Sequence, residues 1–166
     1  TTERRQLAAT GMLRSAAMMQ DDVETIAAAT DMLAEAKLTP ELRNEALYFR
    51  AKAYLNQQAD KKAMNDLQAL AKDTRTLYGA EAKYLVALQL YKAHEYAAAE
   101  KEILNFIEQS TPHAYWLARS FILLSDVYVS MDKKLDARQY LLSLQQNYHA
   151  DDDIEQMINE RLEKLK

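Results

Sequence analysis

Apolar residues recur along this chain at intervals of three and four, which is the spacing of one buried face of an α-helix. Three segments share the pattern without gaps: residues 53–70, 89–106 and 127–144. Each contains an Ala followed four and seven places later by large apolar residues. These sets are Ala63 with Leu67 and Leu70, Ala99 with Ile103 and Phe106, and Ala137 with Leu141 and Leu144. The pattern predicts repeated pairs of short helices that stack on one another.

A weaker copy of the same pattern is expected at the start of the chain. Ala28 precedes Ala63 by 35 positions, and Met19 and Met32 occupy the flanking apolar positions. This alignment places Ala28 at the small position where the two helices of the first pair approach each other.

Capping residues and charge suggest where the helices begin and end. Helix pairs are expected near 3–36, 40–73, 77–109 and 112–147, with a further helix near 152–165. Thr39 and Thr111 are predicted as N-caps because each precedes a proline, which is tolerated at the first helical position. The last helix is polar, as the end of a stack requires. We predict one all-α domain over residues 1–166, an α-solenoid of antiparallel helix pairs with a C-terminal capping helix.

The repeated segments resemble the tetratricopeptide repeat (TPR) family. The small residue that this family places in its first helix is matched by Ala51, Ala87 and Ser125. The resemblance covers nearly the whole chain, although Leu47, Lys83 and Phe121 stand where the family usually has an early Trp. It implies a right-handed superhelix in which the first helices line a concave groove that holds a peptide or a partner helix.

The repeat register predicts which residues face this groove. Tyr48, Tyr84 and Tyr91 are the expected aromatic anchors. The charged and polar positions are Arg14, Lys52, Asn56, Lys92 and Asp126. The sequence leaves an alternative open, in which some of the tyrosines, together with Leu88 and Ile122, only fill the interior of the superhelix.

Composition argues against nucleic-acid binding, a membrane-spanning segment and thiol chemistry. The chain has 21 Lys and Arg against 25 Asp and Glu, a formal net charge of -4, which disfavours nucleic-acid binding. Its most apolar stretch, 111–129, is interrupted by Arg119, Ser120, Ser125 and Asp126, so no membrane-spanning segment is expected. Cysteine is absent, which excludes disulfides and thiol chemistry.

No motif points to catalysis. His94, His113 and His149 lie in different turns, and there is no Gly-rich phosphate loop or nucleophile elbow. The acidic run 151–153 lacks the spacing of a calcium-binding loop and suits the N-terminus of a helix. We therefore expect no enzymatic activity, no cofactor and no metal.

Three longer stretches, 37–55, 72–87 and 111–129, resemble the C-terminal part of large TPR proteins of the Gram-negative cell envelope. Those proteins are often described as similar to the periplasmic coordinator of the Tol-Pal system. The resemblance implies a periplasmic or outer-membrane-associated location. The predicted function is a non-catalytic protein–protein interaction scaffold that binds a peptide or partner helix in its groove. The alternative is self-association, as a homo-oligomer or as part of a longer TPR solenoid.

Overall fold

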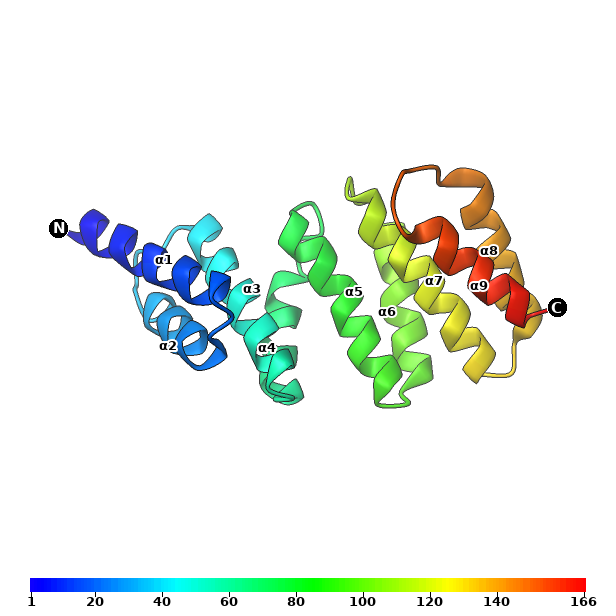
Figure 1. The fold of residues 1–166 in the computed structure, drawn as a ribbon, viewed down its shortest axis with the longest axis horizontal. Helices are drawn as coiled ribbons and strands as arrows, with labels where there is room; N and C mark the ends of the chain where they lie inside the picture. The colour runs from blue at the N-terminus through cyan, green and yellow to red at the C-terminus, as the bar shows by residue number, and fades with distance from the viewer. The chain divides into compact units, whose positions relative to one another are not determined.

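The computed structural model describes all residues from 1 to 166 and contains nine α-helices and no strand. The helices are α1 (Thr2–Met18), α2 (Asp22–Leu33), α3 (Pro40–Asn56), α4 (Asp60–Leu70), α5 (Leu77–Lys92), α6 (Tyr96–Glu108), α7 (Ala114–Ser130), α8 (Lys134–Asn147) and α9 (Ile154–Lys164). Consecutive helices pack as pairs, α1 with α2, α3 with α4, α5 with α6 and α7 with α8 (Figure 1). The predicted all-α class and helix pairs are confirmed.

The contacts between residues divide the chain into two compact units. Unit 1 is Thr1–Asp73 and contains α1 to α4, whereas unit 2 is Thr74–Lys166 and contains α5 to α9. Within unit 1, α3 contacts both α1 and α2; within unit 2, α7 contacts both α5 and α6, and α9 contacts both α7 and α8. Inside each unit, a new helix therefore packs against both members of the preceding pair. A single continuous domain over residues 1–166 remains a prediction.

The small residues of the three clear repeats are buried as their spacing predicts. Ala63, Ala99 and Ala137 are each 0% exposed. The large apolar residues four places later are equally buried: Leu67, Ile103 and Leu141. A methyl group at these positions lets the two helix backbones approach closely, while the larger side chains fill the space beside them.

The first repeat has a different register from the predicted one. Each turn between the helices of a pair contains one residue with positive φ: Gln20, Gln58, His94 and Asp132. The small residue of each clear repeat lies five places after it: Ala63, Ala99 and Ala137. Five places after Gln20 stands Thr25, which is 3% exposed, so Thr25 and not Ala28 takes the small position. The prediction for Met19 is also wrong, because this residue is 76% exposed; Met32 is buried as expected.

Of the two threonines predicted as N-caps before a proline, only Thr39 is one. Pro40 opens α3, and the Thr39 hydroxyl accepts a hydrogen bond from the Leu42 N–H at 3.2 Å, as predicted. Thr111, in contrast, is not an N-cap, because α7 begins at Ala114 with His113 as its cap residue. The Thr111 hydroxyl donates to the Thr74 carbonyl at 2.6 Å instead and ties the connection between α6 and α7 to the start of unit 2.

The first helix of each pair ends in a Schellman motif. After α3, the Gln58 N–H donates to the Leu55 carbonyl (3.0 Å) and the Ala59 N–H to the Tyr54 carbonyl (2.8 Å). This motif places one residue in the left-handed region, where glycine is favoured because it has no Cβ. Here Gln58 holds φ at 59°. The position is therefore strained, and its strain can be tested.

Replacing Gln58 with Gly is expected to stabilise the protein by about 1 kcal/mol, because it removes the steric cost of the left-handed backbone. The neighbouring Gln57 has a φ of -86° and provides a matched control. Gln57→Gly is expected to cost roughly 0.5–1 kcal/mol, because glycine has more conformational freedom in the unfolded chain and loses more of it on folding. Thermal unfolding followed by circular dichroism measures both changes. Shifts of the same sign in the two variants would contradict this account.

The C-terminal helix completes a core in unit 2. Ile154 and Ile158 of α9 form one buried cluster with Ala118 and Ile122 of α7 and with residues Leu141 and Leu144 of α8. The connection from α8 to α9 is held by the Tyr148 hydroxyl, which donates to the Asp152 carboxylate. In Figure 1, α9 (red) runs beside α7 (yellow). Three helices thus share one apolar core.

Tyr148 makes the stability of the fold depend on pH in the alkaline range. Partial burial, together with the hydrogen bond to Asp152, raises the pKa of Tyr148 to about 12. An unfolded chain releases the same proton near pH 10, about the ordinary value for Tyr. Between these values the folded state holds a proton that the unfolded state has lost, so the free energy of unfolding falls as pH rises. Below the unfolded pKa, this contribution is fully present.

We expect Tyr148→Phe to weaken this alkaline loss of stability. Urea denaturation at a series of pH values should give a shallower decline for the variant than for wild type. Some decline persists, because burial and a hydrogen bond with Glu100 also raise the pKa of Tyr128. Identical pH slopes for the two proteins would show that Tyr148 ionises freely in the folded state.

Candidate binding surface

Three of the predicted groove residues share one pocket in unit 1. Tyr48, Lys52 and Asn56 are four residues apart on α3, so they lie on one face of the helix. They line a hollow of about 240 Å³. Its other lining residues come from the end of α1, the start of α2 and α3 itself: Ala17, Gln20, Asp22, Thr25, Phe49 and Ala53. The pocket is therefore built where the first and third helices face the turn between α1 and α2.

Polar contacts hold the walls of this pocket in place. The Asn56 side-chain amide donates to the Asp22 carboxylate at 3.2 Å and ties α3 to α2. The Lys52 ammonium lies 5.8 Å from the centre of the Tyr48 ring, within reach of a cation–π contact. The Tyr48 ring meets Phe49 edge to face at 5.4 Å. The pocket thus combines the aromatic ring of Tyr48, the amide of Asn56 and the ammonium group of Lys52.

Arg14 lies on α1 outside the residues that line this pocket. Its guanidinium donates twice to the Glu45 carboxylate of α3, at 2.6 and 3.0 Å, while its side chain stays 57% exposed. In the register set by the left-handed turn residues, Arg14 precedes Lys52 by 38 positions and is its counterpart on the first helix. The two cations therefore occupy equivalent places on α1 and α3.

Unit 2 has a larger pocket that contains Tyr91 and Asp126. Its volume is about 520 Å³, and it is bounded by α5, α7, the start of α8 and α9. The remaining lining residues are Ser125, Val129, Ser130, Lys134, Glu160, Arg161, Lys164 and Leu165. Exposed Lys134 and Lys164 bring two positive charges to the pocket, and exposed Glu160 brings one negative charge. Lys92 is exposed in the last turn of α5 and does not line the pocket.

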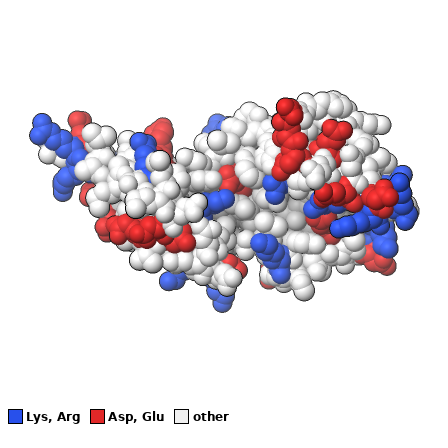
Figure 2. Space-filling view, in the orientation of Figure 1, with Lys and Arg blue, Asp and Glu red and all other residues white.

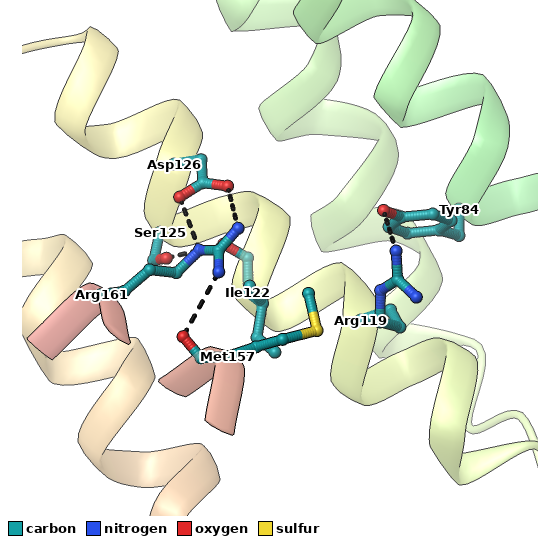
Figure 3. Close-up of polar contacts among 7 residues, drawn as sticks. All are labelled: Tyr84, Arg119, Ile122, Ser125, Asp126, Met157 and Arg161. Atoms are coloured by element: carbon teal, nitrogen blue, oxygen red, sulfur yellow. Dashed lines mark hydrogen bonds and ion pairs between the residues drawn. The ribbon is translucent and has the colours of Figure 1, made fainter. Parts of the chain in front are cut away.

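Asp126 is engaged by the C-terminal helix. The guanidinium of Arg161 donates to both oxygens of the Asp126 carboxylate, at 2.9 and 3.0 Å (Figure 3). The side chains of Asp126 and Arg161 are 27% and 26% exposed. Figure 3 also shows Met157 of α9 beside Ile122 of α7. The C-terminal helix thus forms one wall of the pocket.

Tyr84 is buried inside unit 2. Its side chain belongs to the core, with the residue only 6% exposed, and its hydroxyl accepts a hydrogen bond from Arg119 at 3.1 Å (Figure 3). The Arg119 guanidinium lies 5.0 Å from the centre of the Tyr84 ring, and Trp116 packs against the same ring at 5.6 Å. Ile122 is 0% exposed. At these two positions the side chains fill the interior of unit 2, which is the arrangement that the sequence left open as an alternative.

Arg161 was not among the residues that the sequence predicted for this surface. It lies 35 positions after Asp126, in a helix whose polar sequence suggested only a solvated end. The available signal was the opposite charge of Arg161 and Asp126, but the distance along the chain gave no reason to pair them. Only the packing of α9 against α7 brings the two side chains together.

No group of three or more His, Asp or Glu side chains lies close enough to hold a metal ion. No helix has both the length and the apolar character needed to cross a bilayer. Comparisons with protein-family models, with curated proteins and with solved structures found no match for this chain.

Proposed function

We propose that this chain is a non-catalytic scaffold that binds a peptide or a partner helix on surfaces lined by the first helices of its pairs. One observation supports this most directly: Tyr48, Lys52 and Asn56 line a single pocket in unit 1. Protein-binding surfaces commonly combine aromatic anchors with a few directed polar groups. The tyrosine offers apolar area, and the amide and ammonium groups can fix the orientation of a bound segment.

The pocket of unit 2 provides a second contact region in this proposal. Tyr91 contributes an aromatic side chain, and Lys134 and Lys164 contribute exposed positive charge. Asp126 and Arg161 are paired with each other, so their role is to position the wall formed by α9. A bound segment with a carboxylate near an apolar side chain would match this combination.

The handedness of the helix stack and the capping role of α9 are part of the same proposal. A right-handed TPR-type superhelix with α9 as its capping helix accounts for the way α9 packs on α7 and α8, as α7 packs on α5 and α6. The exposed face of α9 is rich in charge, as a terminal helix requires. A location in the Gram-negative cell envelope is proposed from the sequence resemblance alone, and fractionation of cells followed by immunoblotting tests it.

A variant with Tyr48→Ala, Lys52→Glu and Asn56→Ala tests the pocket of unit 1. We expect the triple substitution to weaken partner binding by about 30-fold or more, because loss of an interface anchor typically costs about 2 kcal/mol or more. Cross-linked capture from cell-envelope extract with the wild-type protein would identify the partner. Titration calorimetry with the purified partner then measures the affinity of both proteins.

A control variant makes the same charge change away from the pocket and truncates two polar side chains to Ala. Lys61→Glu, Asn65→Ala and Gln68→Ala lie at exposed positions of α4. This variant should bind as wild type does, and circular dichroism should show that both variants remain folded. Equal affinity for wild type and the pocket variant would overturn the proposal that this surface binds the partner.

A further inference from the structure

The first helix carries an apolar face that no other part of unit 1 covers. One side of α1 is buried through Thr10, Leu13 and Ala16. The opposite side is exposed and consists of Arg4, Leu7, Ala8, Gly11, Met12, Ser15, Met18 and Met19, here called the α1 stripe. Five of the eight large exposed hydrophobic residues of the chain fall between positions 7 and 23: Leu7, Met12, Met18, Met19 and Val23. A helix that is apolar on both sides is normally covered on both sides.

The equivalent stripe is covered elsewhere in the same chain. With Gln20 and Gln58 aligned, Ala8 and Ser15 correspond to Ala46 and Ala53 of α3, which are 0% and 3% exposed. Ala46 belongs to a core cluster with Ala29 and Met32 of α2, so a neighbouring helix covers this face of α3. With Gln20 and Asp132 aligned, Ala8, Met12 and Ser15 correspond to Ser120, Leu124 and Val127 of α7, which are each 0% exposed in a helix that packs against α6.

The shape of the α1 stripe suits a helix. A shallow hollow of about 450 Å³ runs along it, and its lining includes Ala8, Gly11, Met12 and Ser15. A Cβ added at Gly11 would meet no atom within 4 Å, so the space above the middle of α1 is open. Small residues in the centre allow a second helix to approach closely, and the flexible methionines beside them can adapt to it.

Charge indicates which helix fits. Arg4 lies at the N-terminal end of the stripe, one turn before Ala8, whereas Asp21 and Glu24 line the opposite end of the hollow. Figure 2 shows blue atoms at the N-terminal end of α1, red atoms over α2, and mostly white atoms over α1 between them. When two such stripes are placed antiparallel, the positive end of each lies against the negative end of the other. The stripe together with these flanking acidic residues is therefore complementary to itself.

We propose that the α1 stripe is the interface of a two-fold symmetric dimer, formed by antiparallel packing of α1 against α1 of a second copy. Gly11 lies near the two-fold axis, and Arg4 of each copy faces Glu24 of the other. Closed two-fold dimers are the commonest symmetric assembly because one self-complementary surface is sufficient to form them. The dimer uses none of the residues that line the pockets containing Tyr48 or Tyr91, so it stands apart from the proposed binding function.

A charge-exchange experiment tests this dimer. Analytical ultracentrifugation of the wild-type protein, from micromolar to millimolar concentration, should show a reversible monomer–dimer equilibrium. Arg4→Glu and Glu24→Arg should each weaken dimerisation on the order of tenfold or more, because each substitution sets like charges against each other at two places. An equimolar mixture of the two variants should dimerise as wild type does, since every Glu then faces an Arg.

Other results would overturn the proposal. A wild-type protein that stays monomeric over the whole range does not form this dimer, even if another protein binds the stripe. A dimer that persists in both single variants and in Met12→Glu must use another surface. Lys61→Glu, at an exposed position of α4, is the control and should leave the equilibrium unchanged. Circular dichroism of each variant confirms that the fold is retained, which is expected because the substituted residues are exposed.

Discussion

Replacing Arg50 with Met is expected to destabilise unit 1 by about 3–5 kcal/mol, because the change leaves a buried carboxylate without its partner. Arg50 of α3 donates to both oxygens of Asp66 of α4, at 2.8 and 2.7 Å. Its third nitrogen donates to the Thr30 hydroxyl of α2 at 3.2 Å. The Asp66 side chain is only 5% exposed, so its carboxylate is largely shielded from water and depends on the guanidinium. One residue therefore links three helices.

A second variant separates the cost of an unpaired charge from the worth of the ion pair. In the double variant Arg50→Met with Asp66→Leu, no charge remains buried, and we expect most of the lost stability to return. Arg43→Met, at an exposed position of the same helix, should change stability by no more than about 0.5 kcal/mol. Urea denaturation followed by circular dichroism measures all three. A single variant as stable as Arg43→Met would show that the buried contact contributes nothing.

Replacing Leu141 with Ala is expected to cost about 2–5 kcal/mol in unit 2, because it opens a cavity where three helices meet. Leu141 of α8 is 0% exposed and belongs to the cluster that contains Ile122 of α7 and residues Ile154 and Ile158 of α9. Its loss should loosen α9 in particular, since α9 has no other core in unit 2 to join. Limited proteolysis should therefore cut near residues 150–153 faster in the variant than in wild type.

Two further substitutions in α8 test whether packing is the cause. Leu141→Met keeps most of the side-chain volume and should cost less than about 1.5 kcal/mol. Leu135 is 80% exposed, so Leu135→Ala should have little effect. Thermal unfolding ranks the three variants. A loss for Leu135→Ala as large as that for Leu141→Ala would show that the buried cluster is not the cause, because Ala is at least as good a helix former as Leu.

Local sequence spacing was sufficient to predict much of the fold. Ala63, Ala99 and Ala137 each stand in a helix with large apolar residues four and seven places on, and the helix pairs form where this pattern lies. Pro40 could be placed at the start of α3 because capping depends on residues that are close in the chain. The register of the first repeat could not be read in the same way. The exposed Met19 looks like a core residue in sequence, and only the backbone turn at Gln20 identifies Thr25 as the small position.

The candidate surface was predictable in part. Tyr48, Lys52 and Asn56 share a pocket because their spacing alone places them on one helix face. The same reasoning could not tell that Tyr84 turns into the core, because that depends on Arg119 and Trp116 of another helix.

The sequence by itself determined the class of fold, the helix pairs and which residues share a helix face, since these follow from interactions within a few residues of each other. The tertiary structure alone decided which of those faces are covered. Asp126 meets Arg161 from 35 positions away, and Ala46 is buried by α2 while its counterpart Ala8 stays exposed. Burial depends on which helix packs beside a residue, and local spacing does not specify that neighbour.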